Sequence, residues 1–113
     1  SGGSSSATTI APESVIVPDA TVTAGLQKMP ATIAAAIAAI GTPNAKTALD
    51  AIETQWFSFE GTIREKDAGL YLSIEDQLTP LQRAIEKGDS VNAAAASAIL
   101  SGLFTQYLTT YPG

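Results

Sequence analysis

Apolar residues recur at alternating steps of three and four between residues 20 and 110, which is the spacing of amphipathic helices. One such series is Leu49, Ile52, Trp56, Phe59 and Ile63. A second is Tyr71, Ile74, Leu78, Leu81 and Ile85. Each series falls on one side of a helix, so each predicts a seam packed against neighbouring helices. No series with a period of two competes with them, and the fold class we expect is all-α.

Helix-ending and helix-starting residues divide this region into four segments. Glycine often comes directly after the last turn of a helix because it adopts the left-handed conformation, and proline is tolerated in the first turn. The expected helices are residues 20–40 ending before Gly41, 43–66 capped by Thr42, a third that follows a tight turn or a capped restart at 67–69 and runs to Lys87 before Gly88, and 90–110 capped by Asp89 or Ser90. We expect Pro30 to kink or restart the first helix and Pro80 to bend the third.

The connections between these helices are short, so helices that are neighbours in sequence are expected to run antiparallel. The economical topology is an antiparallel up-down-up-down four-helix bundle over residues 20–113. Small residues at 93–96 allow a close helix approach in the last helix. The apolar residues expected from that helix are Ala95, Ile99, Phe104, Tyr107 and Leu108.

Residues 1–19 are rich in Ser, Gly, Thr, Ala and Pro and predict a flexible N-terminal tether. The apolar patch at 15–17 is the one place where an extended segment could dock on the bundle. The small-residue start resembles the segment directly after the lipid-modified cysteine of a bacterial lipoprotein, and such a cysteine upstream of Ser1 would anchor the protein. A cloning scar or an ordinary disordered terminus is the alternative.

Composition narrows the chemistry. The 113 residues include no cysteine and no histidine, which removes disulfides, zinc-type sites, nucleophilic cysteine and imidazole bases. The formal net charge is −5 and the six cations are scattered, so no basic patch for nucleic acid is expected. No apolar run approaches the roughly 18 residues of a membrane helix. No nucleophile with a base, phosphate loop or cofactor motif is present, so we do not expect an enzyme.

The candidate chemistry lies on either side of the predicted turn at Asp67. Glu60 and Glu75 each come directly after a core position, at nearly equal distances from that turn. In an antiparallel helix pair such positions face each other, near Trp56 and Tyr71. Two facing carboxylates repel unless a proton, a cation or an arginine lies between them.

Three interpretations of this pair remain open. The first is an ion network in which Arg64 binds both glutamates and Tyr71 adds a hydrogen bond. The second is a site for a hard cation, with Glu60 and Glu75 as ligands and Asp67 or Tyr71 nearby. The third is a general acid and base pair, as in glycoside hydrolysis, although a small hairpin offers no obvious cleft for a sugar.

Three neighbouring residues are given structural roles. In the same frame Glu53 is predicted to pair with Gln82, so this position needs no ion. Trp56 lies on the seam and is expected in the core. Gly61 in a helix interior costs about 1 kcal/mol relative to alanine, which indicates close packing at that point.

Two stretches carry a resemblance to a known family. They are Trp56-x-x-x-Glu60-x-x-Ile63-Arg64-x-x-Asp67-x-x-x-Tyr71-x-x-Ile74-Glu75-x-x-Leu78 and Phe104-x-x-Tyr107-Leu108-x-x-Tyr111-Pro112. They resemble the extracytoplasmic helical domain of bacterial iron permeases of the ferric-transporter type and, more distantly, imelysin and EfeO-like periplasmic proteins. The resemblance covers about half the chain.

This resemblance implies a periplasmic or extracytoplasmic helical domain linked to uptake of iron or another hard cation. A membrane permease or another membrane complex is then the expected partner, and Glu60 and Glu75 are the matching acidic positions. The His-x-x-Glu motif of the imelysins has no match, because the chain contains no histidine. The alternative function is a structural or partner-docking lipoprotein module with no ligand site.

Overall fold

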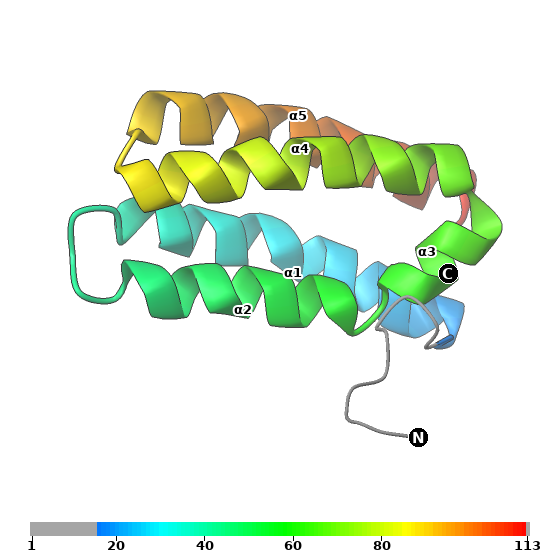
Figure 1. Ribbon diagram of the computed structural model, residues 1–113. Coiled ribbons are helices and arrows are strands. Elements are labelled where there is room, and N and C mark those ends of the chain that lie inside the picture. The colour runs from blue at the N-terminus through cyan, green and yellow to red at the C-terminus, as the bar shows by residue number, and fades with distance from the viewer. Residues whose placement is uncertain (1–15, 113) are drawn as a thin grey trace, which may run out of the picture.

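The computed structural model describes residues 16–112, which form a helical bundle without strands (Figure 1). Its helices are α1 (Asp19–Ala38), α2 (Ala45–Phe57), α3 (Glu60–Lys66), α4 (Ala68–Lys87) and α5 (Ser90–Thr110). Helix α1 packs along α2 and α5, and α4 packs along α5. Figure 1 shows the short α3 at one end, between the α1–α2 pair and the α4–α5 pair. The all-α prediction is therefore confirmed.

The predicted second helix is wrong in its length. The helix is interrupted at Ser58 and Phe59, which separate α2 from α3. The Ser58 hydroxyl donates to the carbonyl of Gln55 at 2.6 Å, and Phe59 leaves the helical conformation with φ −141°. Phe59 is buried, and its ring lies against α1 at Gly25, where a Cβ atom would overlap the ring. Burial of Phe59 against a glycine therefore accompanies the break.

The predicted signals hold at the connection between α4 and α5, whereas α1 ends at Ala38, two residues earlier than predicted from Gly41. Gly88 ends α4 with φ 76°, and the Asp89 carboxylate caps α5 by accepting from the Asn92 amide at 3.0 Å. The predicted Thr42 cap is wrong, because α2 begins two residues later than expected, at Ala45. The Thr42 hydroxyl instead donates to the Ala39 carbonyl at 2.6 Å and closes the turn after α1. Both α1 and α4 continue through their interior prolines.

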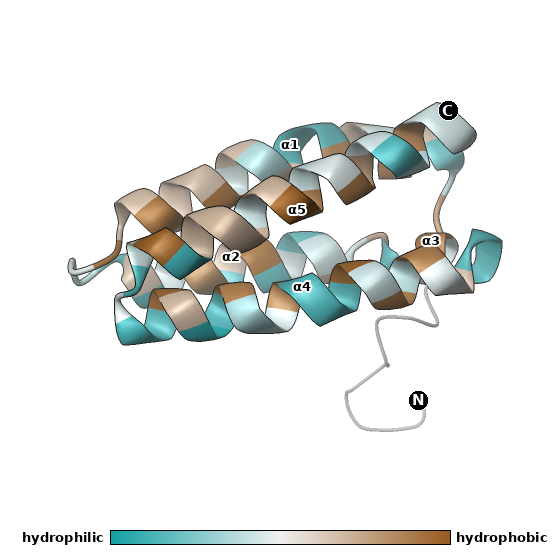
Figure 2. Cartoon of the chain, turned by 90° about the horizontal axis from the view of Figure 1, so that it is seen from above, coloured by the Kyte–Doolittle hydropathy of each residue, from teal (hydrophilic) through white to brown (hydrophobic). Residues whose placement is uncertain are grey.

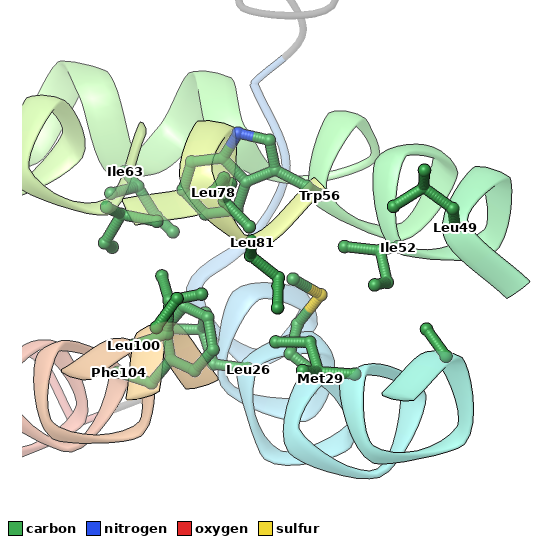
Figure 3. Packing of buried hydrophobic residues seen from close by; sticks show 14 of the residues in the cluster. Leu26, Met29, Leu49, Ile52, Trp56, Ile63, Leu78, Leu81, Leu100 and Phe104 are labelled. Carbon is green, nitrogen blue, oxygen red and sulfur yellow. The ribbon is translucent and has the colours of Figure 1, made fainter. Parts of the chain in front are cut away.

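The two predicted seams are buried (Figure 3). Every member of both series is buried except Tyr71, which is half-buried. Trp56 is 2% exposed, as expected of a core residue. Together with apolar residues of α1 and α5 these side chains make one continuous core. Burial of such side chains is the main stabilising contribution to a domain of this size.

The predicted face of the last helix is partly wrong. Ala95 and Ile99 are exposed, and Ile99 retains half of its surface. The buried residues of α5 are Ala93, Ala96, Leu100, Phe104 and Tyr107. Helix α5 contains no charged residue, so no charged face marks its solvent side in the sequence. Figure 2 shows this difference, with hydrophilic colour recurring along α4 and pale or hydrophobic colour dominating α5.

The segment before α1 docks on α3. The Thr62 hydroxyl accepts from the amide of Val17 at 2.7 Å and donates to its carbonyl at 2.9 Å. Pro18 has extended backbone and leads into α1 at Asp19. Docking of an extended segment is thus confirmed at Val17. Residues 1–15 lie outside the described part of the chain, so the predicted tether stays a prediction there.

Candidate functional site

Two stacked aromatic side chains form the centre of the candidate site. Trp56 at the end of α2 stacks on Tyr71 in the first turn of α4, with ring centroids 6.0 Å apart and planes 16° from parallel. Phe59 meets the edge of the same indole at 5.8 Å and 84°. These geometries are the ones in which aromatic pairs attract each other. The three rings together therefore hold α2, the helix break and α4 against one another.

Each candidate glutamate accepts a hydrogen bond from one ring of this pair. The Trp56 indole nitrogen donates to Glu75 Oε2 at 2.5 Å, and the Tyr71 hydroxyl donates to Glu60 Oε1 at 3.0 Å. Glu60 is only 2% exposed, whereas Glu75 is half-buried. Burial of a carboxyl group is unfavourable unless donors satisfy its oxygens. The phenol of Tyr71 supplies one such donor.

The structure changes the predicted pairing of the two glutamates. The expected Gln82 partner of Glu53 is confirmed, since its amide donates to Glu53 Oε2 at 3.2 Å. After the helix break at Phe59, the two glutamates accept hydrogen bonds from aromatic side chains. Glu60 accepts from Tyr71, and Glu75 accepts from Trp56. Arg64 is exposed and takes part in neither ion pair described between residues 16 and 112, which are Lys46–Asp50 and Lys66–Asp19.

Asp67 belongs to a different group of contacts. Its Oδ1 accepts from the Leu70 amide at 3.0 Å and caps α4, so the predicted capped restart is confirmed. Its Oδ2 accepts from the Tyr111 hydroxyl at 3.1 Å, which ties α5 to the α3–α4 junction. Within residues 16–112 no group of three or more acidic side chains is close enough to hold a metal ion.

Gly61 lies buried in the first turn of α3, so the prediction that it lies in a helix interior is wrong.

A groove between α2 and α4 was not predicted. One part, of about 490 Å³, is lined by apolar residues such as Leu49 and Ile85 and by the acids Asp50, Glu53 and Glu86. A second part, of about 160 Å³, reaches Trp56 and Glu75, and both parts include Glu53 and Gln82. The sequence does contain acidic residues beside the two seams. This pattern is equally typical of an ordinary solvent-exposed helix face, so it does not predict a groove.

Tyr107 and Tyr111, whose rings are in contact at the end of α5, both have raised pKa values. Burial, with the nearby negative charge of Asp19 adding to it, raises the pKa of Tyr107 from 10.0 to about 12. Burial and its hydrogen bond to Asp67 also raise the pKa of Tyr111. A raised folded-state pKa stabilises the fold fully below the unfolded value and loses that contribution as pH rises toward the folded value.

We therefore expect stability to fall between pH 10 and about 12, and to fall less steeply in Tyr107→Phe, which keeps the ring. Urea unfolding of both proteins across this range measures the difference. An identical decline in the two proteins would contradict a stabilising role for the neutral phenol.

Comparison of the chain with family models, with curated proteins and with solved structures gives no match. Among residues 16–112 no helix is both long and apolar enough to cross a membrane. The resemblance to the iron permease domain therefore rests on the sequence alone.

Proposed function

We propose that this chain is a non-catalytic helical domain that docks on a partner protein and has no ligand site of its own. The observation that carries the proposal is the use of the candidate acids within the fold. Glu75 accepts a hydrogen bond from the Trp56 indole, Glu60 accepts one from the Tyr71 hydroxyl, and Asp67 caps α4. These contacts hold helices together, and we interpret α1, α2, α4 and α5 as an up-down-up-down bundle with α3 as its joint.

We propose further that the domain works outside the cytoplasm and binds a membrane permease or another membrane complex. This part is supported by the resemblance of residues 56–78 and 104–112 to the permease-associated domain. Lipid anchorage through a residue upstream of Ser1 belongs to the same proposal.

Iron handling is the second candidate function. It is favoured by one specific observation, namely that Glu60 and Glu75 are bound to the two members of a single stacked ring pair. Carboxylate and phenol oxygens are ligands for hard cations. In this alternative a cation would displace the hydrogen bond from Tyr71 and recruit both carboxylates.

Replacement of both glutamates by glutamine distinguishes the two functions. Glutamine keeps a carbonyl acceptor for each aromatic donor and removes the charge that a cation needs. For a docking domain we expect ferric citrate, ferrous iron and calcium to leave the melting temperature of wild type and of Glu60→Gln/Glu75→Gln unchanged.

Calorimetric titration with the same three metal probes is the second measurement. A saturable site in the wild-type protein that is lost in the double variant would overturn the docking proposal in favour of metal binding. Glu65→Gln/Asp76→Asn is the matched control, because it removes the same amount of charge at two exposed positions.

A further inference from the structure

The groove between α2 and α4 combines an apolar floor with acidic walls. Its floor is the outer edge of the packed core, with Leu49 and Ile85 at one end and Ile52, Trp56 and Leu78 at the other, each 7% exposed or less. The Glu53–Gln82 hydrogen bond crosses between the helices and lines both cavities, so the two cavities adjoin at this pair. The thirteen residues of α2 extend for about 20 Å at 1.5 Å per residue, which equals three to four turns of a second helix.

The charges of this groove are unbalanced. Four carboxylates line it, on Asp50, Glu53, Glu75 and Glu86. Lys46 is the cation among the lining residues, and it is paired with Asp50 at 3.4 Å. A partner with positive charges flanking an apolar stripe would match both features, because complementary potentials steer and orient association.

An exposed aromatic side chain lies at the Trp56 end of the groove. Phe57 is 43% exposed although it comes directly after a fully packed tryptophan, and it lines the smaller section. Exposed aromatic residues beside an apolar pocket are typical anchors of protein interfaces. Phe57 therefore marks an edge that a partner can cover.

We infer that the α2–α4 groove is the docking surface, and that its occupant is a basic amphipathic helix of a partner protein. The apolar stripe of that helix covers the exposed ring of Phe57 and the apolar atoms that line the groove, and its lysine or arginine side chains reach the four carboxylates. This inference rests on the docking function proposed above and names its site. Amphipathic helices are commonly bound in this way, with apolar anchors spaced three and four residues apart.

The charge pattern distinguishes this occupant from the chain's own segments. Residues 1–15 contain no lysine or arginine and carry Glu13, so they do not complement acidic walls. Helix α5 has an exposed face around Val91 and Ile99 but carries no charge, so the same face of a second copy would leave the carboxylates unmatched.

The test uses a synthetic amphipathic helix built only from lysine and leucine, with one leucine stripe and three to four turns. Trp56 is the only tryptophan and lines the groove, so its fluorescence reports occupancy. We expect saturable one-to-one binding that weakens as salt is added. An otherwise identical peptide with glutamate in place of lysine should not bind.

Two charge-reversal variants then locate the site. Asp50→Lys/Glu86→Lys changes the groove, whereas Glu65→Lys/Asp76→Lys makes the same change in net charge at exposed positions outside it. We expect the groove variant to weaken binding about tenfold or more and the control to change it by less than about threefold. Phe57→Ser should also weaken binding while leaving the melting temperature nearly unchanged, because this side chain is largely exposed.

Equal effects of the two reversals would mean that net charge alone attracts the peptide and would overturn the inference. Absence of saturable binding would overturn it as well, and so would backbone amide shifts that map the peptide to the α1–α5 face. These outcomes leave the docking function itself in place. Failure of that function is recognised separately, by a metal site lost in Glu60→Gln/Glu75→Gln.

Discussion

Replacement of Trp56 by alanine should lower the free energy of unfolding by about 3–5 kcal/mol, the cost expected for removing a large buried aromatic side chain. Trp56 is 2% exposed, stacks on Tyr71 and donates its indole hydrogen to Glu75. Figure 3 shows the indole nitrogen on the side of the ring away from Leu81, Leu26 and Met29. The variant therefore loses packing, stacking and a hydrogen bond together. Urea unfolding measures the change.

Two neighbouring variants serve as controls. Trp56→Phe keeps a buried ring and loses the donor to Glu75, so its effect should be intermediate. Phe57→Ala should cost less than about 1 kcal/mol, because its side chain is 43% exposed. A loss below about 1 kcal/mol for Trp56→Ala would show that the indole is not part of the packed core.

Replacement of Gly25 by alanine should destabilise the fold by about 1–3 kcal/mol, as overpacking of a core does. A Cβ atom at this position would overlap the buried ring of Phe59, which is held between α1 and the edge of Trp56. In an exposed helix interior the same change should stabilise instead. Gly102 of α5 is such a position, since nothing lies within 4 Å of the added atom, and Gly102→Ala should gain about 0.5–1 kcal/mol.

A double-mutant cycle identifies the cause. In a Phe59→Ala background the ring is gone, so Gly25→Ala should lose most of its destabilising effect. Thermal and chemical unfolding of the four proteins provide the coupling free energy. An undiminished cost in the Phe59→Ala background would refute the steric explanation and point to the helix α1 backbone instead.

The helix break at Phe59 shows why part of the fold was not predictable. Leu49 to Ile63 keeps its spacing of three and four through the break, so periodicity conceals the interruption. The break coincides with the contact between Phe59 and Gly25, which are far apart in the sequence. Local propensity contains no information on such a contact. The long amphipathic seams, by contrast, were predictable because each buries a defined face.

The candidate site was predicted in its members more than in its contacts. Counting from the turn at Asp67 correctly placed Glu60, Glu75 and Tyr71 near Trp56, and the same frame correctly paired Glu53 with Gln82. The hydrogen-bond partners depend on how α3 is turned after the break, and the sequence does not specify that orientation. In α5 no charged residue marks the solvent-facing side, so the sequence did not specify which face is buried. Ala95 and Ile99 were therefore wrongly predicted to be buried.

The contacts of Thr62 with Val17 have a mechanical consequence. Val17 is hydrogen-bonded to Thr62 in α3, and Tyr111 is hydrogen-bonded to Asp67, the residue directly after α3. Tension applied between these two points therefore passes through residues 62–67 by the shortest route. Lys66 reinforces that route, since it pairs with Asp19 at 2.9 Å and lies over the Tyr111 ring. Under force applied at Val17 and Tyr111, we therefore expect these contacts to break before the long helices separate.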